Sequence, residues 1–320
     1  MVTVVIPTYK RLNSLKRTLQ SIEKQTLLPE KVLIIIAGIN KTDIENIIRE
    51  IILPIEVIIS EPSVCKQRNI GIKKAVTRYI LLCDDDIVLP ENYIKTLESY
   101  HYANPEIRIV TGEELRLQPD NNWRPFTDKT SFIRLYYHYF FGLPVWDDLS
   151  YNRPTKNFWQ KYILNIYQKK GNITTKAGWP LLTQRTHPIF KTTIYGLGAA
   201  MIKTDLLQKN LFDESLEQFG IGDNYDVGLR INTNKCRIHV LTTIPYKHYK
   251  ESSNRLEPSQ AYYHRTKTLY QCLKKLSVFS SKNIWYFRWS LLGNGIAFLI
   301  KGRFNYLKSN YKVFWNTLTS

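Results

Sequence analysis

Cysteine, acidic side chains and uninterrupted apolar runs are all scarce in this sequence of 320 residues. The four cysteines are Cys65, Cys83, Cys236 and Cys272. None belongs to a CxxC pair, which argues against a zinc site and against a dithiol redox motif. We therefore expect free, mostly buried thiols in a reducing compartment. The longest apolar stretch, residues 284–300, contains Arg288 and Asn294, so a buried or interfacial helix is expected there rather than a membrane span.

Acidic residues are outnumbered, with 27 Asp and Glu against 45 Lys and Arg, for a formal net charge of +18. A basic surface favours polyanions, whether nucleic acid, anionic lipid headgroups or phosphate-bearing substrates. No recognition motif for RNA or DNA is evident, so we expect no nucleic-acid partner. The opening residues MVTVVIPTYK lack the basic and apolar regions of a signal peptide, so a cytoplasmic location is expected.

Short β-branched runs alternate with helical patterns through the first third of the chain. The expected strands are residues 2–7, 31–36, 55–59, 79–83 and 107–112, and the expected helices are residues 11–25, 42–51, 65–76 and 90–102. This alternation predicts an α/β fold with a mostly parallel, Rossmann-like sheet flanked by helices. The strands are mostly apolar, as expected of strands that are buried on both faces.

The chain after residue 112 is less regular. Residues 113–191 are rich in aromatic residues and only weakly periodic, which predicts a long functional insertion. A strand at residues 194–202, a helix at 223–231 and a strand at 236–242 are expected next. From residue 260 onward the chain is expected to be helical, basic and aromatic.

Three consecutive aspartates, Asp84, Asp85 and Asp86, follow the fourth expected strand. Ligands of open parallel sheets bind outside the carboxyl ends of the strands. Two carboxylates at i and i+2 can reach one hard cation such as Mg²⁺ or Mn²⁺, which would offset their mutual repulsion. The alternative is that they cap the helix that begins near Pro90, but capping needs only one of them.

Four segments together resemble family-2 glycosyltransferases of the bacterial surface-polysaccharide type, which have the GT-A fold. The segments are VVIPTYKRLNSLKRTLQSIEKQT, VCKQRNIGIKKAVTRYILLCDDDIVLPENYI, YGLGAAMIKTDLL and FDESLEQFGIGDNYDVGLRI. They correspond to the family's Pro-Thr-Tyr strand end, its Arg-Asn-x-Gly helix with the Asp-x-Asp run, its acceptor-side segment and its acidic helix start. The resemblance covers roughly residues 2–250, and the four segments occur in the family's order.

The resemblance implies a metal-dependent, inverting transfer of a sugar from a nucleotide-sugar donor to a hydroxyl of a glycan or lipid-linked acceptor, in cell-surface polysaccharide biosynthesis. Mn or Mg is the implied cofactor. Asp84 and Asp86 take the metal-binding roles, and Asp85 lies beside the donor ribose. His248 is implied as a third metal ligand or a diphosphate contact, with a structural histidine as the alternative. The residues expected to bind the donor are Pro7, Thr8, Tyr9, Arg11, Arg68, Asp84 and Asp85.

The catalytic base is expected in the segment GIGDNYDVGLR. The family usually has Glu-Asp at this point, and its second acid is often the base. Here the pair reads Asp223-Asn224, and an amide has no useful proton affinity, so either Asp223 or Asp226 must take the role. Asp223 is favoured because it lies at the expected helix start. The alternative is that Asp223 only caps the helix and that Asp226 pairs with Arg230 at i+4.

The segment after the second expected strand departs from the family pattern. The family often has Val-Asp-Asp-Gly-Ser-Thr-Asp after its second strand, and the first Asp contacts the base. Here Ala37 and Gly38 stand in that region, so the contact to uracil is lost unless Asp43 replaces it. A UDP-sugar remains the expected donor, with the base open. Lys247, Lys250 and Arg255 either bind phosphate or form a solvated basic face.

The expected organisation is a GT-A catalytic domain at residues 1–250, followed by a helical extension at 251–320. Within the domain, residues 1–112 form the nucleotide-sugar half, and residues 113–250 form the acceptor half with the aromatic insertion. The extension is expected either to lie peripherally on the inner face of the cell membrane or to pack on the core. The insertion tryptophans either stack on sugars or pack internally; they are Trp123, Trp146, Trp159 and Trp179.

Other functions stay open at this point. A sugar nucleotidyltransferase has a similar sheet but usually carries a glycine-rich loop with a lysine near its N-terminus, and IPTYKRLNSL has no glycine. A catalytically degenerate relative that binds glycan or nucleotide is also consistent with Asn224. A transfer or hydrolysis assay separates that relative from an active enzyme.

Overall fold

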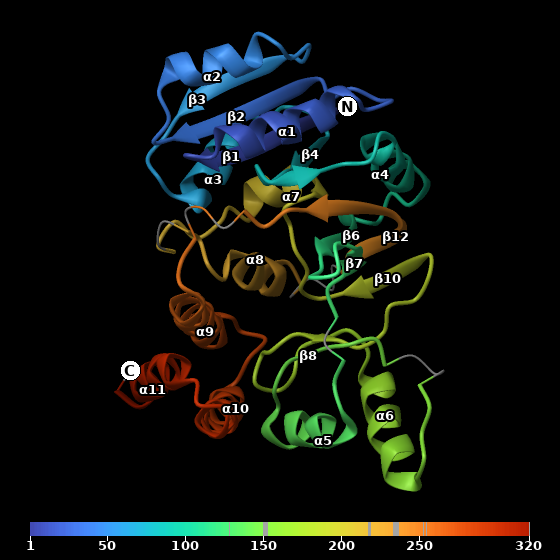
Figure 1. Ribbon diagram of the computed structural model, residues 1–320, viewed down its shortest axis with the longest axis vertical. Coiled ribbons are helices and arrows are strands. Elements are labelled where there is room, and N and C mark those ends of the chain that lie inside the picture. The colour runs from blue at the N-terminus through green and yellow to red at the C-terminus, as the bar shows by residue number, and fades with distance from the viewer. Residues whose placement is uncertain are drawn as a thin grey trace.

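Figure 1 presents the computed structural model, which describes residues 1–127, 129–149, 153–216, 219–232, 237–251, 253 and 255–319. The N-terminal part alternates strands and helices as expected. Its elements are β1 (Val2–Tyr9), α1 (Leu12–Glu23), β2 (Lys31–Ala37), α2 (Lys41–Ile48), β3 (Ile55–Ile59), α3 (Val64–Lys74), β4 (Tyr79–Leu82), β5 (Ile87–Val88) and α4 (Tyr93–Ala103). Ser63 ends the loop before α3, and its side chain caps the helix by accepting a hydrogen bond from the Lys66 amide.

The remaining elements complete the sheet and add a helical end to the molecule. They are β6 (Ile109–Leu117), β7 (Trp123–Pro125), α5 (Phe132–Phe141), β8 (Val145–Trp146), α6 (Phe158–Lys170), β9 (Leu181–Leu182), β10 (Ile189–Thr192), β11 (Ala200–Lys203), α7 (Thr204–Lys209), α8 (Asp223–Asn232), β12 (Ile238–His248), α9 (Pro258–Lys275), α10 (Ser281–Ile300) and α11 (Phe304–Thr319).

One large sheet crosses the molecule in the order β10-β12-β6-β11-β4-β1-β2-β3, with β5 paired to β12 and β7 to β6. Strands β4, β1, β2 and β3 are parallel, and β11 is inserted antiparallel between β4 and β6. The core of β1 and β2 is buried on both faces of the sheet. Helices α1, α2 and α4 cover one apolar face, and α3, α7 and α8 cover the other. The expected α/β class, with a central sheet flanked by helices, is confirmed.

The segment 113–191 is more regular than its sequence pattern predicts. It contains two helices, α5 and α6, besides short strands. The segment FIRLYYHYFF of α5 is aromatic almost all round, and Ile133 and Phe140 are exposed while Leu135 and Phe141 are buried. A helix that is apolar on both its buried and exposed faces shows little 3.6-residue periodicity, so the pattern hides it. In addition, β6 runs on to Leu117 and β12 to His248, past the strand ends expected from the sequence.

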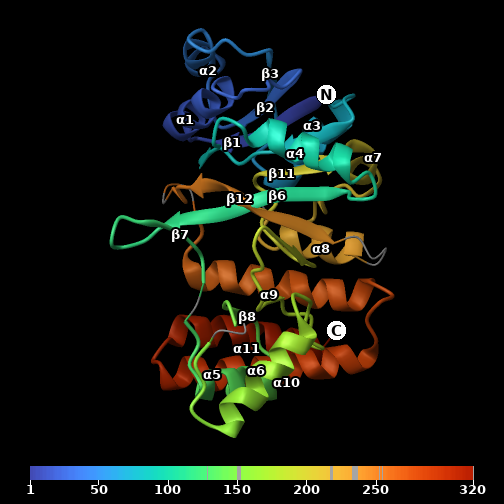
Figure 2. The same cartoon turned by 90° about the vertical axis from the view of Figure 1, so that its right-hand side faces the viewer.

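The three C-terminal helices pack against the insertion and against α8. Figures 1 and 2 show α9, α10 and α11 together with α5 and α6 at the end of the molecule opposite β1–β3. Their shared core includes Trp179, Leu229, Phe287 and Leu291, and the indole N–H of Trp179 donates to the Ser290 hydroxyl over 2.8 Å. Packing on the core, one of the two alternatives for the extension, is therefore found. Among the described residues, no helix combines the length and apolar character that crossing a bilayer requires.

The described cysteines are free and buried, as expected from the sequence. Cys65, Cys83 and Cys272 are buried and unpaired. Burial raises the pKa of all three thiols above its usual range, so they remain protonated near neutral pH. Cys236, and the expected start of the strand there, lie outside the described residues.

Candidate functional site

A cavity of about 400 Å³ opens where the parallel strands end. Its lining combines the end of β1, the start of α3, the residues after β4, the loop into α8, and the chain from β12 into α9. The residues expected from the sequence that line it are Pro7, Thr8, Tyr9, Arg11, Arg68, Asp84, Asp85, Asp86, Asp223 and His248. Asp226, the other candidate base, does not line this cavity. The topology thus brings together side chains that are up to 241 positions apart in the sequence, from Pro7 to His248.

The three aspartates face three different sets of partners. Asp84 accepts from Arg68 over 2.7 Å, and its amide donates to the Gly198 carbonyl over 2.8 Å. Asp85 accepts from the Thr8 hydroxyl over 2.7 Å and from Arg11 over 3.3 Å. A Cβ on Gly198 would lie 2.2 Å from the Asp84 carboxylate, so only glycine leaves room for that side chain.

Asp86 is the most deeply buried of the three, with 1% of its surface exposed. His248 Nε2 lies 3.0 Å from one carboxylate oxygen, and Arg255 donates to the other over 2.9 Å. Burial alone would raise the pKa of Asp86, but the hydrogen bond from His248 and the charges of Arg255 and Arg11 bring it to about 2. Asp85 differs, because burial raises its pKa to about 6 in spite of Arg11. Asp86 is therefore held in its charged form more firmly than Asp85.

Asp84, Asp86 and His248 can together hold a cation. Each offers one ligand atom, and the three atoms lie within 4.8 Å of one another. Two carboxylate oxygens and one imidazole nitrogen suit Mn²⁺, and the carboxylates suit Mg²⁺. The chemistry of this donor set fits the divalent ion expected from the sequence, and His248 lies on the cavity side of β12 as that role requires.

Glu114 is a member of the site that the sequence analysis missed. It is partly buried on β6, and His248 Nδ1 donates to its carboxylate over 3.2 Å, while Arg116 donates over 2.6 Å. Burial would raise the pKa of Glu114, but the His248 hydrogen bond and the Arg116 charge hold it below its usual range. When no cation occupies Nε2, the carboxylates of Asp86 and Glu114 raise the pKa of His248 to about 9 against the opposing effect of burial. A carboxylate on the second ring nitrogen fixes the orientation of the imidazole. The only sequence signal was the acidic pair Glu113-Glu114 directly after the strand expected at residues 107–112.

The two candidate bases at the start of α8 have different surroundings. Asp223 lines the cavity and forms an ion pair with Arg68, which joins it to Asp84. Burial raises the pKa of Asp223, and Arg68 opposes that rise only in part. Asp226 instead accepts two hydrogen bonds from Arg230, over 2.9 and 2.7 Å, which is the i+4 pair expected from the sequence. Asn224 also lines the cavity, and its buried side-chain oxygen has no hydrogen-bond partner among the described residues.

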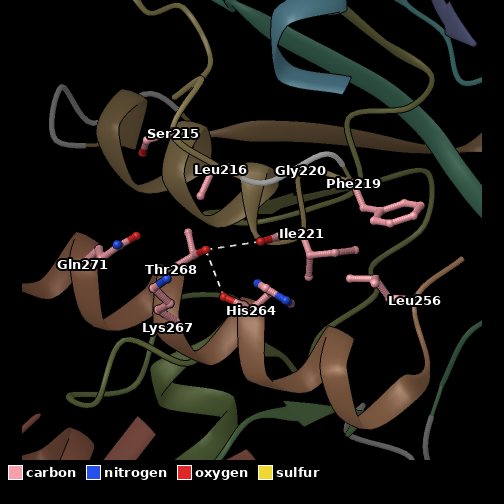
Figure 3. A pocket seen from close by; sticks show the side chains of 10 residues that line it. All are labelled: Ser215, Leu216, Phe219, Gly220, Ile221, Leu256, His264, Lys267, Thr268 and Gln271. Carbon is pink, nitrogen blue, oxygen red and sulfur yellow. Dashed lines mark hydrogen bonds between the residues drawn. The ribbon is translucent and has the colours of Figure 1, made fainter. Parts of the chain in front are cut away.

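A hydrogen bond holds the loop before Asp223 against α9. The Thr268 hydroxyl donates to the Ile221 carbonyl over 3.2 Å and to the His264 carbonyl over 3.0 Å, and Figure 3 shows both bonds beside a small hollow of about 30 Å³. Gly222 has a φ of +103°, and a Cβ there would lie 2.6 Å from Thr268. Gly222 is thus required by the close approach of α9, and Gly220, with a φ of +55°, by that of α3, because a Cβ there would lie 2.2 Å from Val64. Arg255 and Arg265, from the expected extension, also line the main cavity.

Several other expected contacts are absent from the described cavity. Lys247 and Lys250 do not line it; Lys247 lies 5.5 Å from the centre of the Trp123 ring, and Lys250 lies 3.8 Å from Glu114. Asp43 and the four insertion tryptophans do not line it either. Trp179 is buried in the core and Trp159 is exposed on α6. Internal packing accounts for Trp179, and the region of Ala37 supplies no carboxylate to the cavity.

Comparison with known proteins agrees with this geometry. Residues 1–265 match the family described as Glycosyltransferase like family 2. A curated relative, the uncharacterized glycosyltransferase YwdF of Bacillus subtilis (strain 168), is 34% identical over 120 residues, which cover 35% of this chain and 44% of that protein. The match therefore spans less than half of that relative's length.

Solved structures with a similar fold include two of TarS from S. aureus. The structure of its residues 1–349 has a TM-score of 0.53 and 16% identity, covering 91% of this chain and 70% of that chain. The same fragment in complex with UDP has a TM-score of 0.52 and 15% identity, with the same coverage. At this level of identity, the likeness concerns the fold.

Proposed function

The chain belongs to glycosyltransferase family 2, and on that premise we propose that it is a metal-dependent, inverting glycosyltransferase. Membership confirms the family resemblance drawn from the sequence. The proposed donor is a nucleotide sugar, with UDP as the nucleotide, and the proposed acceptor is a hydroxyl of a glycan or lipid-linked glycan in cell-surface polysaccharide biosynthesis. The observation that carries the proposal is one cavity in which Asp84, Asp86 and His248 meet the buried Arg68–Asp223 pair.

Charged residues of the cavity would bind the donor and its metal ion. Asp84, Asp86 and His248 would hold the divalent ion, whose chemistry is to neutralise the diphosphate leaving group. Arg11, Arg255 and Arg265 also line the cavity and would bind phosphate oxygens. Thr8 fixes Asp85, the residue proposed beside the donor ribose, and Pro7 and Tyr9 complete the nucleotide side of the cavity.

The acceptor half requires a base at the opposite side of the donor sugar. We assign this role to Asp223, because it lines the cavity and because burial raises its pKa towards the working range of a general base. Its carboxylate would take the proton of the acceptor hydroxyl as that oxygen attacks the anomeric carbon. The bond from that carbon to the diphosphate oxygen breaks in the same step, and the nucleotide diphosphate leaves. A single displacement of this kind inverts the anomeric centre.

The proposed organisation keeps residues 1–112 as the nucleotide-sugar half and residues 113–250 as the acceptor half. The extension at 251–320 is proposed to complete the catalytic cavity through Arg255 and Arg265, and to hold the enzyme peripherally on the cytoplasmic face of a membrane. A peripheral position would suit a lipid-linked acceptor. The UDP complex of TarS, a protein of similar fold, supports UDP as the first nucleotide to test.

The nucleotide is identified by thermal unfolding across a panel of nucleoside diphosphates and nucleotide sugars, each with Mn²⁺ or with EDTA. We expect one nucleotide class, UDP first, to raise the midpoint only when Mn²⁺ is present. A ligand at 100 times its Kd stabilises the native state by about 2.7 kcal/mol. A folded protein that no member of the panel stabilises would contradict the donor site and favour a degenerate relative. Stabilisation that is equal in EDTA would contradict the metal.

A further inference from the structure

Helix α10 carries a continuous exposed apolar stripe along its whole length. Its members recur every three or four residues: Trp285, Trp289, Leu292, Ile296, Leu299 and Ile300. They are between 40% and 78% exposed, whereas Phe287 and Leu291, on the opposite side of the helix, are fully buried. The stripe is therefore not the packing face of α10. It is a second apolar face that the described chain leaves uncovered, whereas an ordinary surface helix shows a polar face there.

The stripe continues onto a neighbouring helix. The Trp289 ring lies 5.3 Å from the Phe140 ring of α5, and its indole N–H donates to the Phe140 carbonyl over 2.9 Å. Phe140 is 63% exposed and Ile133, on the same helix, is 84% exposed. Helix α11 repeats the pattern, with Phe304, Tyr311, Trp315 and Leu318 exposed at similar spacing. We call the exposed apolar residues of α5, α10 and α11 the basal face.

The helices around the basal face contain no acidic residue. Between residues 258 and 320 the sequence has ten Lys or Arg and no Asp or Glu, and α5 and α6 also lack acids. Lys282 and Arg288 lie on α10, and Lys301 and Arg303 follow its end directly. All 27 acidic residues precede residue 258, so the charge is segregated along the chain. Such a face attracts an anionic surface and repels a second copy of itself.

We propose that the basal face docks onto the interface of a bilayer that contains anionic lipid, and this proposal rests on the peripheral association proposed above. Exposed indole and aliphatic groups would enter the headgroup and upper acyl region while the flanking cations meet lipid phosphate. A free polyanion would need the cations but not the apolar stripe. Helix α10 is not proposed to cross the bilayer. Arg288 and Asn294 interrupt its apolar sequence, and it is not apolar enough for a membrane span.

Docking through this face would set the height of the catalytic cavity above the lipid. Helix α9 lies between them: Arg265 lines the cavity, while the Tyr262 hydroxyl donates to Asn310 of α11 over 2.6 Å and Lys312 of α11 lies 4.7 Å from the Tyr263 ring. The cavity is thus one helix layer above the helices that would touch the membrane. A lipid-linked acceptor could reach it while its lipid remained in the bilayer.

The test is flotation of the purified full chain with vesicles of phosphatidylcholine alone or mixed with phosphatidylglycerol, at low and high salt. The wild type should float with the anionic vesicles, less at high salt because of screening. The triple variant Trp285→Ser/Leu292→Ser/Ile300→Ser should bind the anionic vesicles about tenfold more weakly than the wild type. The matched control Ile52→Ser/Val76→Ser, which removes exposed apolar side chains from the N-terminal half, should float like the wild type. Nucleotide-dependent thermal stabilisation should be unchanged in both variants, which separates failure of docking from failure of the donor site.

Three results would overturn the proposal. Flotation of the triple variant to the same extent as the wild type would show that the apolar stripe does not contribute to membrane binding. Equal competition by soluble polyphosphate for the wild type and the triple variant would make the region a polyanion site. A dimer in light scattering that the triple variant abolishes, with no flotation of the wild type, would assign the basal face to a second copy of the chain.

Discussion

Asp86→Asn is expected to abolish the Mn²⁺-dependent stabilisation by nucleotide and to lower kcat about 10³-fold, equivalent to about 4 kcal/mol of barrier. Asp86 is the most buried of the three carboxylates and contacts His248 directly. The amide keeps the size of the side chain but removes its charge, so the remaining ligand set would be Asp84 and His248. Two ligands hold a divalent ion more weakly than three.

The control for Asp86→Asn is Asp205→Asn, which removes an exposed carboxylate that pairs with Arg108 on the surface. This variant should keep the Mn²⁺-dependent stabilisation by nucleotide, and its kcat should stay within about twofold of the wild-type value. Ion pairs on the surface contribute little to stability. Circular dichroism checks that Asp86→Asn remains folded, since His248 and Arg255 lose a partner. A folded Asp86→Asn protein that still responds to Mn²⁺ and nucleotide would show that the metal binds elsewhere.

Asp223→Asn is expected to lower kcat by about 10² to 10⁴, the range that general-base catalysis contributes, while nucleotide binding changes by no more than a few-fold. Asp223 lies in the cavity beside Arg68, whereas the ligand atoms of the metal site belong to other residues. The loss should therefore fall on the chemical step and spare donor binding. Single-turnover kinetics, together with the nucleotide Kd, separate these two effects.

Asp226→Asn is the matched comparison, because it neutralises the other acid in the first turn of α8. Asp226 pairs with Arg230 and does not line the cavity, so kcat should stay within a few-fold of wild type. Its stability should fall by about 1 kcal/mol or less. The opposite outcome, a large loss in Asp226→Asn and little change in Asp223→Asn, would move the base to Asp226.

Local patterns were enough to predict strands β1 to β4 and the acidic run, whereas the strand expected at residues 194–202 is found only at Ala200–Lys203. Apart from Thr3, Thr8 and Lys31, the residues of β1, β2 and β4 are apolar, as is typical of strands that are buried on both faces. The aspartates follow β4 directly, and topology alone places them at the ligand-binding edge of a parallel sheet. The segment Pro7 to Arg11 was predictable for the same reason, since it ends β1.

Contacts between distant residues were not predictable from the chain. Arg68 and Asp223 are 155 residues apart, and Glu114 and His248 are 134 apart. No local pattern shows that Glu114 faces the imidazole, because β6 runs on beyond its expected end. The two acids of α8 could not be separated either. Only the fold shows that Asp223 faces the cavity while Asp226 turns to Arg230.

The measurement that tests the central claim most directly is NMR of the anomeric signals while the wild-type chain turns over the nucleotide sugar chosen by the panel. Water can serve as a slow acceptor, so the assay needs no knowledge of the glycan. We predict release of nucleoside diphosphate together with a sugar of inverted anomeric configuration, in Mn²⁺ and not in EDTA. Release of the retained anomer, turnover at the same rate in EDTA, or a folded, donor-binding protein with no turnover would contradict a metal-dependent inverting transferase.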